Sequence, residues 1–155
     1  MSEARLPGRY PWLEEPWSFF SRCLEMDRLP HALLVEGPPG CGKTALAAAM
    51  TARLLCLEDQ PVACGQCRSC KLLAGGAHPE YIEVTFELNE SGNMSSVLTV
   101  GQVRATIEAL YLTRTISRRK VAYIHPADAM NRNAANALLK TLEEPAGTDT
   151  VIILV

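Results

Sequence analysis

The stretch GPPGCGKT, residues 37–44, decides the fold class. It matches the phosphate-binding pattern G-x-x-x-x-G-K-[ST] at every fixed position. The apolar run at residues 32–36 predicts a buried strand before it, and the alanine- and leucine-rich residues 43–56 predict a helix after it. A glycine-rich loop between a strand and a helix turns backbone N–H groups toward phosphate at the positive end of the helix dipole. The sequence therefore predicts a nucleotide-binding P-loop.

Each position of this loop has an expected role. Lys43 suits the β- and γ-phosphates, and the Thr44 hydroxyl suits Mg²⁺, so ATP with magnesium is the candidate ligand. Cys41 stands at a variable position and is interpreted as a bystander. A glycine-rich turn that matches the pattern by chance is the alternative. The predicted nucleotide-binding residues are Gly37, Pro38, Pro39, Gly40, Cys41, Gly42, Lys43 and Thr44.

Strands and helices alternate outward from the loop. Helices are predicted at 12–27, 71–75, 99–113 and 132–144, strands at 81–86, 120–125 and 149–155, a turn-rich loop at 57–70 and a polar loop at 87–98. This alternation indicates an α/β domain whose parallel sheet is covered by helices on both faces. The last predicted strand runs to Val155, which favours a single domain, 1–155, truncated at its C-terminus within a longer protein.

Composition narrows the class further. The chain has 155 residues, 48% of them hydrophobic and 21% charged, with a formal net charge of −2. These values are typical of a soluble globular domain and give no basic footprint for nucleic acid. The N-terminus, with its acids and prolines, is not a secretory signal, and no apolar run is long enough to span a membrane. A cytoplasmic location is expected.

Four of the six cysteines form a spaced group, C-x7-C-x2-C-x2-C. Two-residue gaps let successive thiolates converge on one ion, and four thiolates suit a closed, structural zinc site. An iron–sulfur cluster is the alternative, because its ligands share such spacings. Cys23 is interpreted as a core residue on the first helix. The predicted metal ligands are Cys56, Cys64, Cys67 and Cys70.

The strand at 120–125 ends without acids. ATP-hydrolysing P-loop proteins place carboxylates near the phosphates to hold magnesium and to orient water. Here His125 and Pro126 follow Ile124, and Asp128 comes three residues late. His125 is open to two interpretations, a phosphate contact or a plain loop residue. No catalytic residue is assigned, and we expect nucleotide binding with weak or absent hydrolysis.

Three stretches together resemble the clamp-loader branch of the AAA+ ATPases: LPHALLVEGPPGCGKT (29–44), CLEDQPVACGQCRSC (56–70) and NAANALLKTLEEP (133–145). The resemblance implies an AAA+ fold with a small zinc-binding insertion at 56–70. Within that branch, Tyr10-Pro11-Trp12, His78-Pro79-Glu80-Tyr81 and the absent acids resemble the non-motor, stator-like subunits rather than the gamma/tau motor.

The resemblance also implies partners and a process. A subunit of this kind assembles with gamma/tau and delta subunits, and the complex loads a sliding clamp on primed DNA. An arginine lent to a neighbouring ATP site would lie beyond Val155. The alternatives are an active gamma/tau-type ATPase and, from another class, a P-loop small-molecule kinase with Arg114, Arg118 and Arg119 in a lid. Arg118-Arg119-Lys120 also suits a DNA contact, or more simply a solvated turn.

Overall fold

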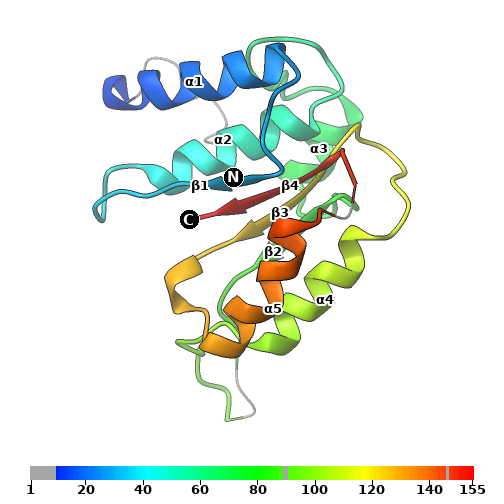
Figure 1. Cartoon of the computed structure of the whole chain (residues 1–155). Coiled ribbons are helices and arrows are strands. Elements are labelled where there is room, and N and C mark those ends of the chain that lie inside the picture. The colour runs from blue at the N-terminus through cyan, green and yellow to red at the C-terminus, as the bar shows by residue number, and fades with distance from the viewer. Residues whose placement is uncertain (1–9, 89–90, 146) are drawn as a thin grey trace.

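The protein was analysed as a computed structural model that describes residues 10–88, 91–145 and 147–155. Expectations for residues 1–9 and for Asn89 in the polar loop lie outside this part of the chain. The strands are β1 (Ala32–Leu34), β2 (Tyr81–Val84), β3 (Lys120–Ile124) and β4 (Thr150–Leu154). They form one parallel sheet in the order β1-β4-β3-β2 (Figure 1). The predicted parallel sheet is confirmed.

Helices cover both faces of the sheet (Figure 1). α1 (Glu14–Glu25), α2 (Lys43–Leu55) and α3 (Arg68–Ala74) lie on one face, and α4 (Val100–Leu110) and α5 (Arg132–Glu143) lie on the other. Alternate side chains of β3 pack into the two hydrophobic cores, one on each face of the sheet. Val121 and Tyr123 pack with the α2 side, and Ala122 and Ile124 pack with the α4–α5 side. This two-sided burial is why the strand is apolar at almost every position.

Two short 3₁₀ turns flank the helices. The predicted helix at 12–27 begins as η1 (Pro11–Leu13), and η2 (Ala127–Ala129), which was not predicted, follows β3. α3 begins at Arg68, three residues before its predicted start. The reason is local: the Cys67 Sγ accepts the N–H of Cys70 and caps the helix. Half of the cysteine group therefore lies at the start of a helix rather than in a loop.

The prediction that residues 32–36 form a buried strand was wrong in both extent and burial: the strand ends at Leu34, and none of its residues is fully buried. Leu34 is 62% exposed, and only the three residues of β1 have strand structure. β1 lies at an edge of the sheet, with β4 as its only neighbouring strand among the described residues. An apolar run shows that a strand has a core face, but it cannot show that both faces and both edges are covered.

The interpretation of Lys120 as part of a solvated basic turn was also wrong. Lys120 is 5% exposed, and its ammonium donates hydrogen bonds to the carbonyls of Ala109 and Leu110, at 3.3 and 2.9 Å. These carbonyls lie at the C-terminal end of α4, where the regular helical hydrogen bonds run out, so a cation stabilises them. The helix stops there, and Tyr111 and Leu112 are exposed. Among the described residues, no helix is long and apolar enough to cross a membrane.

Candidate nucleotide site and cysteine cluster

The P-loop leaves the end of β1 and enters α2. Gly40 and Gly42 have φ of +80° and +90°, a region that side chains disfavour, and Gly42 caps α2. Lys43 is the first residue of the helix, and its ammonium donates a 3.0 Å hydrogen bond to the Gly37 carbonyl across the loop. Gly37 to Gly40 and Thr44 are exposed. A phosphate therefore has access to the loop, and the donors it requires are present.

The N-terminal segment packs on the loop, which sequence patterns had not predicted. The indole N–H of Trp12 donates a 2.8 Å hydrogen bond to the Cys41 carbonyl, although the residue is 62% exposed. A Cβ on Gly42 would lie 3.1 Å from the Leu13 side chain, so this position needs glycine for space as well as for φ. The sequence predicts only that a helix begins at Trp12, and no local signal indicates its contact with Cys41, 29 positions away.

His125 lies at the sheet edge where the loop lies. Its N–H donates a 2.9 Å hydrogen bond to the Val84 carbonyl. Its Nδ1 is buried and has no hydrogen-bond partner among the described residues. Asp128 is exposed on η2, past the end of β3. The strand end therefore presents an imidazole and a proline ring where a hydrolytic site would present carboxylates.

A carboxylate from the neighbouring strand β2 lies close to this end of β3. Glu83 on β2 pairs in register with Tyr123 on β3, and it is exposed. Burial, together with the Glu83 charge, raises the pKa of the Tyr123 phenol to about 12, and the neighbouring Thr44 hydroxyl lowers it in part. Tyr123 thus lies between the β2 carboxylate and the hydroxyl expected to bind magnesium. The sequence after β3 gives no sign of Glu83, because this residue lies on β2 and reaches Tyr123 only through the pairing of the two strands.

The four predicted cysteines converge. Their Sγ atoms all lie within 4.8 Å of one another, and the Cys64 and Cys70 sulfurs are 3.9 Å apart. Tetrahedral zinc with bonds of about 2.3 Å places thiolates about 3.8 Å apart, so the spacing fits that ion. The Cys64 sulfur also accepts the N–H groups of Gln66 and Cys67, at 3.4 and 3.3 Å.

The surroundings of these thiols differ. The two N–H groups lower the pKa of Cys64 to about 7, because they stabilise its thiolate. Burial raises the pKa of Cys56 and of Cys70. A bound cation would hold all four sulfurs as thiolates, because its charge offsets the cost of ionising the buried Cys56 and Cys70.

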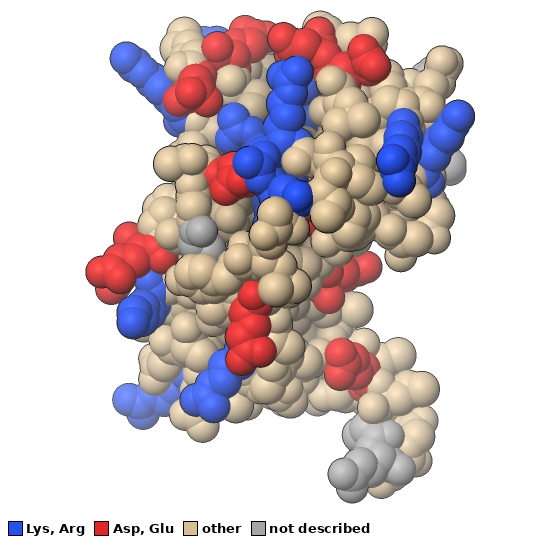
Figure 2. All heavy atoms as spheres, turned by 90° about the vertical axis from the view of Figure 1, so that its right-hand side faces the viewer, with Lys and Arg blue, Asp and Glu red and all other residues tan. Residues whose placement is uncertain are grey.

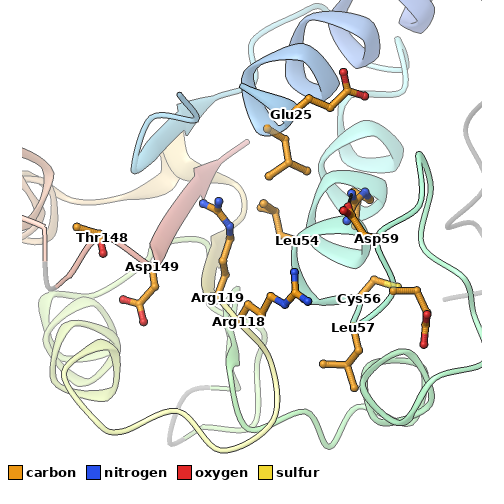
Figure 3. Close-up of a pocket in the computed structure, with 12 residues that line it drawn as sticks. Glu25, Leu54, Cys56, Leu57, Asp59, Arg118, Arg119, Thr148 and Asp149 are labelled. Atoms are coloured by element: carbon orange, nitrogen blue, oxygen red, sulfur yellow. Dashed lines mark hydrogen bonds and ion pairs between the residues drawn. The ribbon is translucent and has the colours of Figure 1, made fainter. Parts of the chain in front are cut away.

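A cavity of about 440 Å³ lies away from the P-loop. Arg118 and Arg119 extend into it from the start of β3 (Figure 3). Because all strands are parallel, this edge is opposite the one where β1 ends and the P-loop begins. The arginines therefore do not form a lid over the loop. A smaller cavity of about 250 Å³ adjoins the P-loop at Cys41 and Lys43.

Charges around the large cavity are mixed. Arg53 pairs with Asp59 at 3.1 Å, and Arg119 pairs with Asp27 at 3.4 Å. Figure 2 shows lysines and arginines interspersed with acids on this side of the molecule. A DNA contact through a concentrated basic patch gains no support from this surface.

Two relatives that resemble the chain over most of its length are both named delta'. The chain is 43% identical over 147 residues to the DNA polymerase III subunit delta' of Pseudomonas aeruginosa. The matched region covers 94% of this chain and 42% of that protein. It is 37% identical over 137 residues to the delta' subunit of Escherichia coli (strain K12), 88% of the chain and 40% of that protein. The chain thus spans about two fifths of the length of these relatives.

Weaker similarities include a tau/gamma subunit and a gamma subunit-related protein. The DNA polymerase III subunit tau/gamma of Haemophilus influenzae is 32% identical over 123 residues, 79% of the chain and 17% of that protein. A crystal structure of a DNA polymerase III gamma subunit-related protein from Thermotoga maritima superposes with a TM-score of 0.58 at 18% identity, covering 89% of this chain and 38% of that one. That similarity concerns the fold.

The fold is that of a parallel-sheet α/β protein, and its sequence carries the G-x-x-x-x-G-K-[ST] pattern between β1 and α2. The family described as "DNA polymerase III, delta subunit" matches residues 12–155. Together with the relatives named delta', this match shows that the chain belongs to the delta-prime family of DNA polymerase III subunits.

Proposed function

We propose that the chain is the nucleotide-binding AAA+ domain of a non-motor, stator-like subunit of the DNA polymerase III clamp loader. In that role it helps to load the sliding clamp on primed DNA, in a complex with gamma/tau and delta subunits. The relatives named delta' and tau/gamma support the assembly. The observation that carries the non-motor assignment is an intact P-loop facing a strand end that reads His125-Pro126. A cytoplasmic location remains the expectation.

Nucleotide binding follows from the loop's own groups. The N–H groups of residues 37–42 would surround a phosphate, and Lys43 would exchange its bond with the Gly37 carbonyl for phosphate oxygens. Thr44 is exposed and would contribute its hydroxyl to magnesium. Bound ATP would supply charge and contacts that order the loop. Trp12 already fixes the loop on its outer side through Cys41, so little reorganisation is required.

The end of β3 lacks the carboxylates that ATP hydrolysis requires. Pro126 has no side chain that accepts a proton, and an imidazole such as His125 is a poor ligand for magnesium. Each 1.4 kcal/mol of lost barrier stabilisation slows a reaction about tenfold, so turnover should be negligible. The active gamma/tau-type ATPase remains the second candidate for one specific reason: Glu83 places a carboxylate beside Tyr123 and Thr44. The kinase alternative has lost its support, since Arg118 and Arg119 lie at the opposite sheet edge.

The cysteine cluster would hold zinc as a structural ion. Cys56 and Cys70 are buried, and four thiolates leave no open position for substrate or water. Zinc would tie the segment after α2 to the start of α3. The iron–sulfur alternative uses the same ligands and is distinguished by its colour and iron content.

Assembly tests this proposal. The full natural protein is mixed with gamma/tau and delta subunits, and the mixture is separated by size and assayed for clamp loading. We expect a stable complex whose loading requires this subunit. Its Lys43→Ala variant should assemble and support loading almost as well, because a stator does not cycle through hydrolysis. Failure to assemble would refute the proposal, and loss of loading with Lys43→Ala would favour the motor alternative.

A further inference from the structure

A buried polar network lies next to the cysteine cluster. The Leu55 carbonyl, at the end of α2, accepts hydrogen bonds from the hydroxyls of Ser69 (2.5 Å) and Ser117 (2.9 Å). The Nε2 of His78 lies 2.7 Å from the Ser69 hydroxyl and 3.0 Å from the Ser117 hydroxyl. Ser69 is fully buried, and so is the His78 side chain.

The hydrogen bonds determine the protonation of His78. Its Nδ1 accepts the N–H of Glu80 at 3.1 Å and so carries no proton. The proton of the neutral ring is therefore on Nε2, which donates to the serine hydroxyls, while both hydroxyls donate to Leu55. The 3.7 Å approach of Nδ1 to the Glu80 carboxylate would be an ion pair only in a protonated ring. Burial lowers the pKa of His78, and the Glu80 charge opposes this only in part.

These residue types also occur in hydrolase triads, but the arrangement is not one. A triad histidine donates Nδ1–H to its acid and accepts the serine proton at Nε2, which is the reverse of the present tautomer. Ser69 is also sealed from solvent, so no substrate can reach its hydroxyl.

The network instead positions the backbone next to two of the cysteines. Leu55 immediately precedes Cys56, and Ser69 immediately precedes Cys70. The Ser69–Leu55 bond therefore sets the distance between the two buried ligands, and His78 orients the serine that makes this bond. Ser117 ties the same carbonyl to the turn before β3, where the Glu80 carboxylate accepts three backbone N–H groups, those of Thr115, Ile116 and Ser117.

We propose that His78 is a positioning residue for the cysteine metal site and acts through Ser69 and Ser117. The inference rests on the proposed zinc site. Through this network the ion is joined to β2 and to the turn before β3, so that binding of a metal at the cluster stiffens the edge of the sheet where β2 begins.

Two substitutions separate the two sides of the ring. His78→Gln can keep a donor toward the serines, and His78→Asn can keep an acceptor for the Glu80 N–H but is too short to reach the hydroxyls. Ser69→Ala removes the link to Leu55. Thr106→Val is the matched control: it deletes a buried hydroxyl of α4 that bonds to the Gln102 carbonyl at 2.9 Å, away from the cluster.

Each full-length protein, freed of metal, is titrated with cobalt(II) against a competing chelator. Thiolate-to-cobalt absorption bands report the four-sulfur site, and circular dichroism reports folding. Substitutions beside metal ligands weaken binding about 10- to 100-fold, so we expect His78→Asn and Ser69→Ala to lose about tenfold in affinity. His78→Gln should lose less, and Thr106→Val should bind as wild type.

The outcomes are distinguishable. Wild-type protein without thiolate bands would refute the metal site and, with it, the role of His78. Normal bands with equal affinity in all variants would leave the metal site standing and overturn the positioning role. If a His78 variant does not fold, Ser69→Ala and Ser117→Ala decide the question, because each deletes a single hydroxyl. Equal losses in Thr106→Val would also overturn the inference, since they would reflect general destabilisation.

Discussion

The His125 N–H donates a 2.9 Å hydrogen bond to the Val84 carbonyl, and this bond fixes His125 at the end of β3 beside β2. The imidazole is thus held at the sheet edge where the P-loop lies. Since Asp128 lies past the strand on η2, the end of β3 presents an imidazole ring rather than a carboxylate. This relationship underlies the account of a nucleotide that is bound and not consumed.

Loss of the loop's cation should weaken nucleotide binding without harming the fold. A hydrogen bond to a charged group contributes about 1.5–3 kcal/mol, so Lys43→Ala should weaken ATP binding about 10- to 100-fold. The ammonium bonds to Gly37 at the surface, and its loss should leave the melting temperature nearly unchanged. Lys71→Ala on α3 is the control and should bind normally. Calorimetric titration checks both, and an unchanged affinity in Lys43→Ala would mean that the loop is a relic.

An acid at the end of β3 should create a magnesium dependence. His125→Asp adds a carboxylate that repels phosphate when it is alone and attracts the metal when Mg²⁺ is present. The ratio of ATP affinities with and without Mg²⁺ should rise by at least about tenfold over wild type. Asp128→Asn serves as the control, because that carboxylate is exposed past the strand and its loss should leave the ratio as it was. A ratio unaffected by His125→Asp would place the phosphates elsewhere.

Metal removal should destabilise the region of the cysteines. In a domain of this size each kcal/mol lost lowers the melting temperature by about 2–4 °C, and we expect a strong chelator to lower it by about 5–10 °C. Cys67→Ser should reproduce that loss and become insensitive to chelator. Cys23→Ser should respond to chelator as wild type does, because Cys23 lies on α1 outside the cluster. A melting curve indifferent to chelator in a zinc-loaded protein would argue against a structural ion.

Acid should destabilise the protein through His78 and Glu80. Burial lowers the pKa of His78 in the folded protein below its ordinary value of about 6.5. As the pH falls through that value, the imidazole is protonated in the unfolded state but not yet in the folded state, so the free energy of unfolding decreases. Burial alone would raise the pKa of Glu80, but the N–H groups of Thr115, Ile116 and Ser117 and the Thr115 hydroxyl lower it. Its stabilisation is present above about pH 4.5 and is lost as the pH falls through the lowered value.

The measurement is the free energy of unfolding at several pH values. It should fall between about pH 7.5 and about pH 5.5, and fall further below about pH 4.5. His78→Gln should flatten the first decline, whereas His125→Asn should retain it. A decline of equal slope in His78→Gln would show that another group, such as the cysteine cluster, controls acid sensitivity.

Local patterns predicted the features that are themselves local. The order of strands and helices, the P-loop between β1 and α2, and the grouping of four cysteines are all visible in residue spacing, because periodicity and turn chemistry act over a few residues. The alternating burial of β3 likewise follows from its apolar run. Element ends were less accurate, as at α3, where a cysteine cap moved the start of the helix.

The missed features depend on contacts between distant residues. Trp12 meets Cys41 across 29 positions, Glu80 meets Thr115 across 35, and Ser69 meets Ser117 across 48. Lys120 was misread because the carbonyls it caps belong to another element. Glu83 was missed because its position beside Tyr123 depends on strand register. Such pairings are set by the tertiary fold, and a single sequence carries no local signal for them.

Titration of the protein with ATP and Mg²⁺, followed by a hydrolysis assay on the same sample, decides whether this subunit binds a nucleotide without consuming it. The account predicts saturable binding that requires Lys43 and turnover that does not exceed the background. Clear turnover that Lys43→Ala abolishes would contradict it. If Glu83→Gln abolished that turnover too, the carboxylate on β2 would have taken the place of the missing acids, and the chain would be an active ATPase.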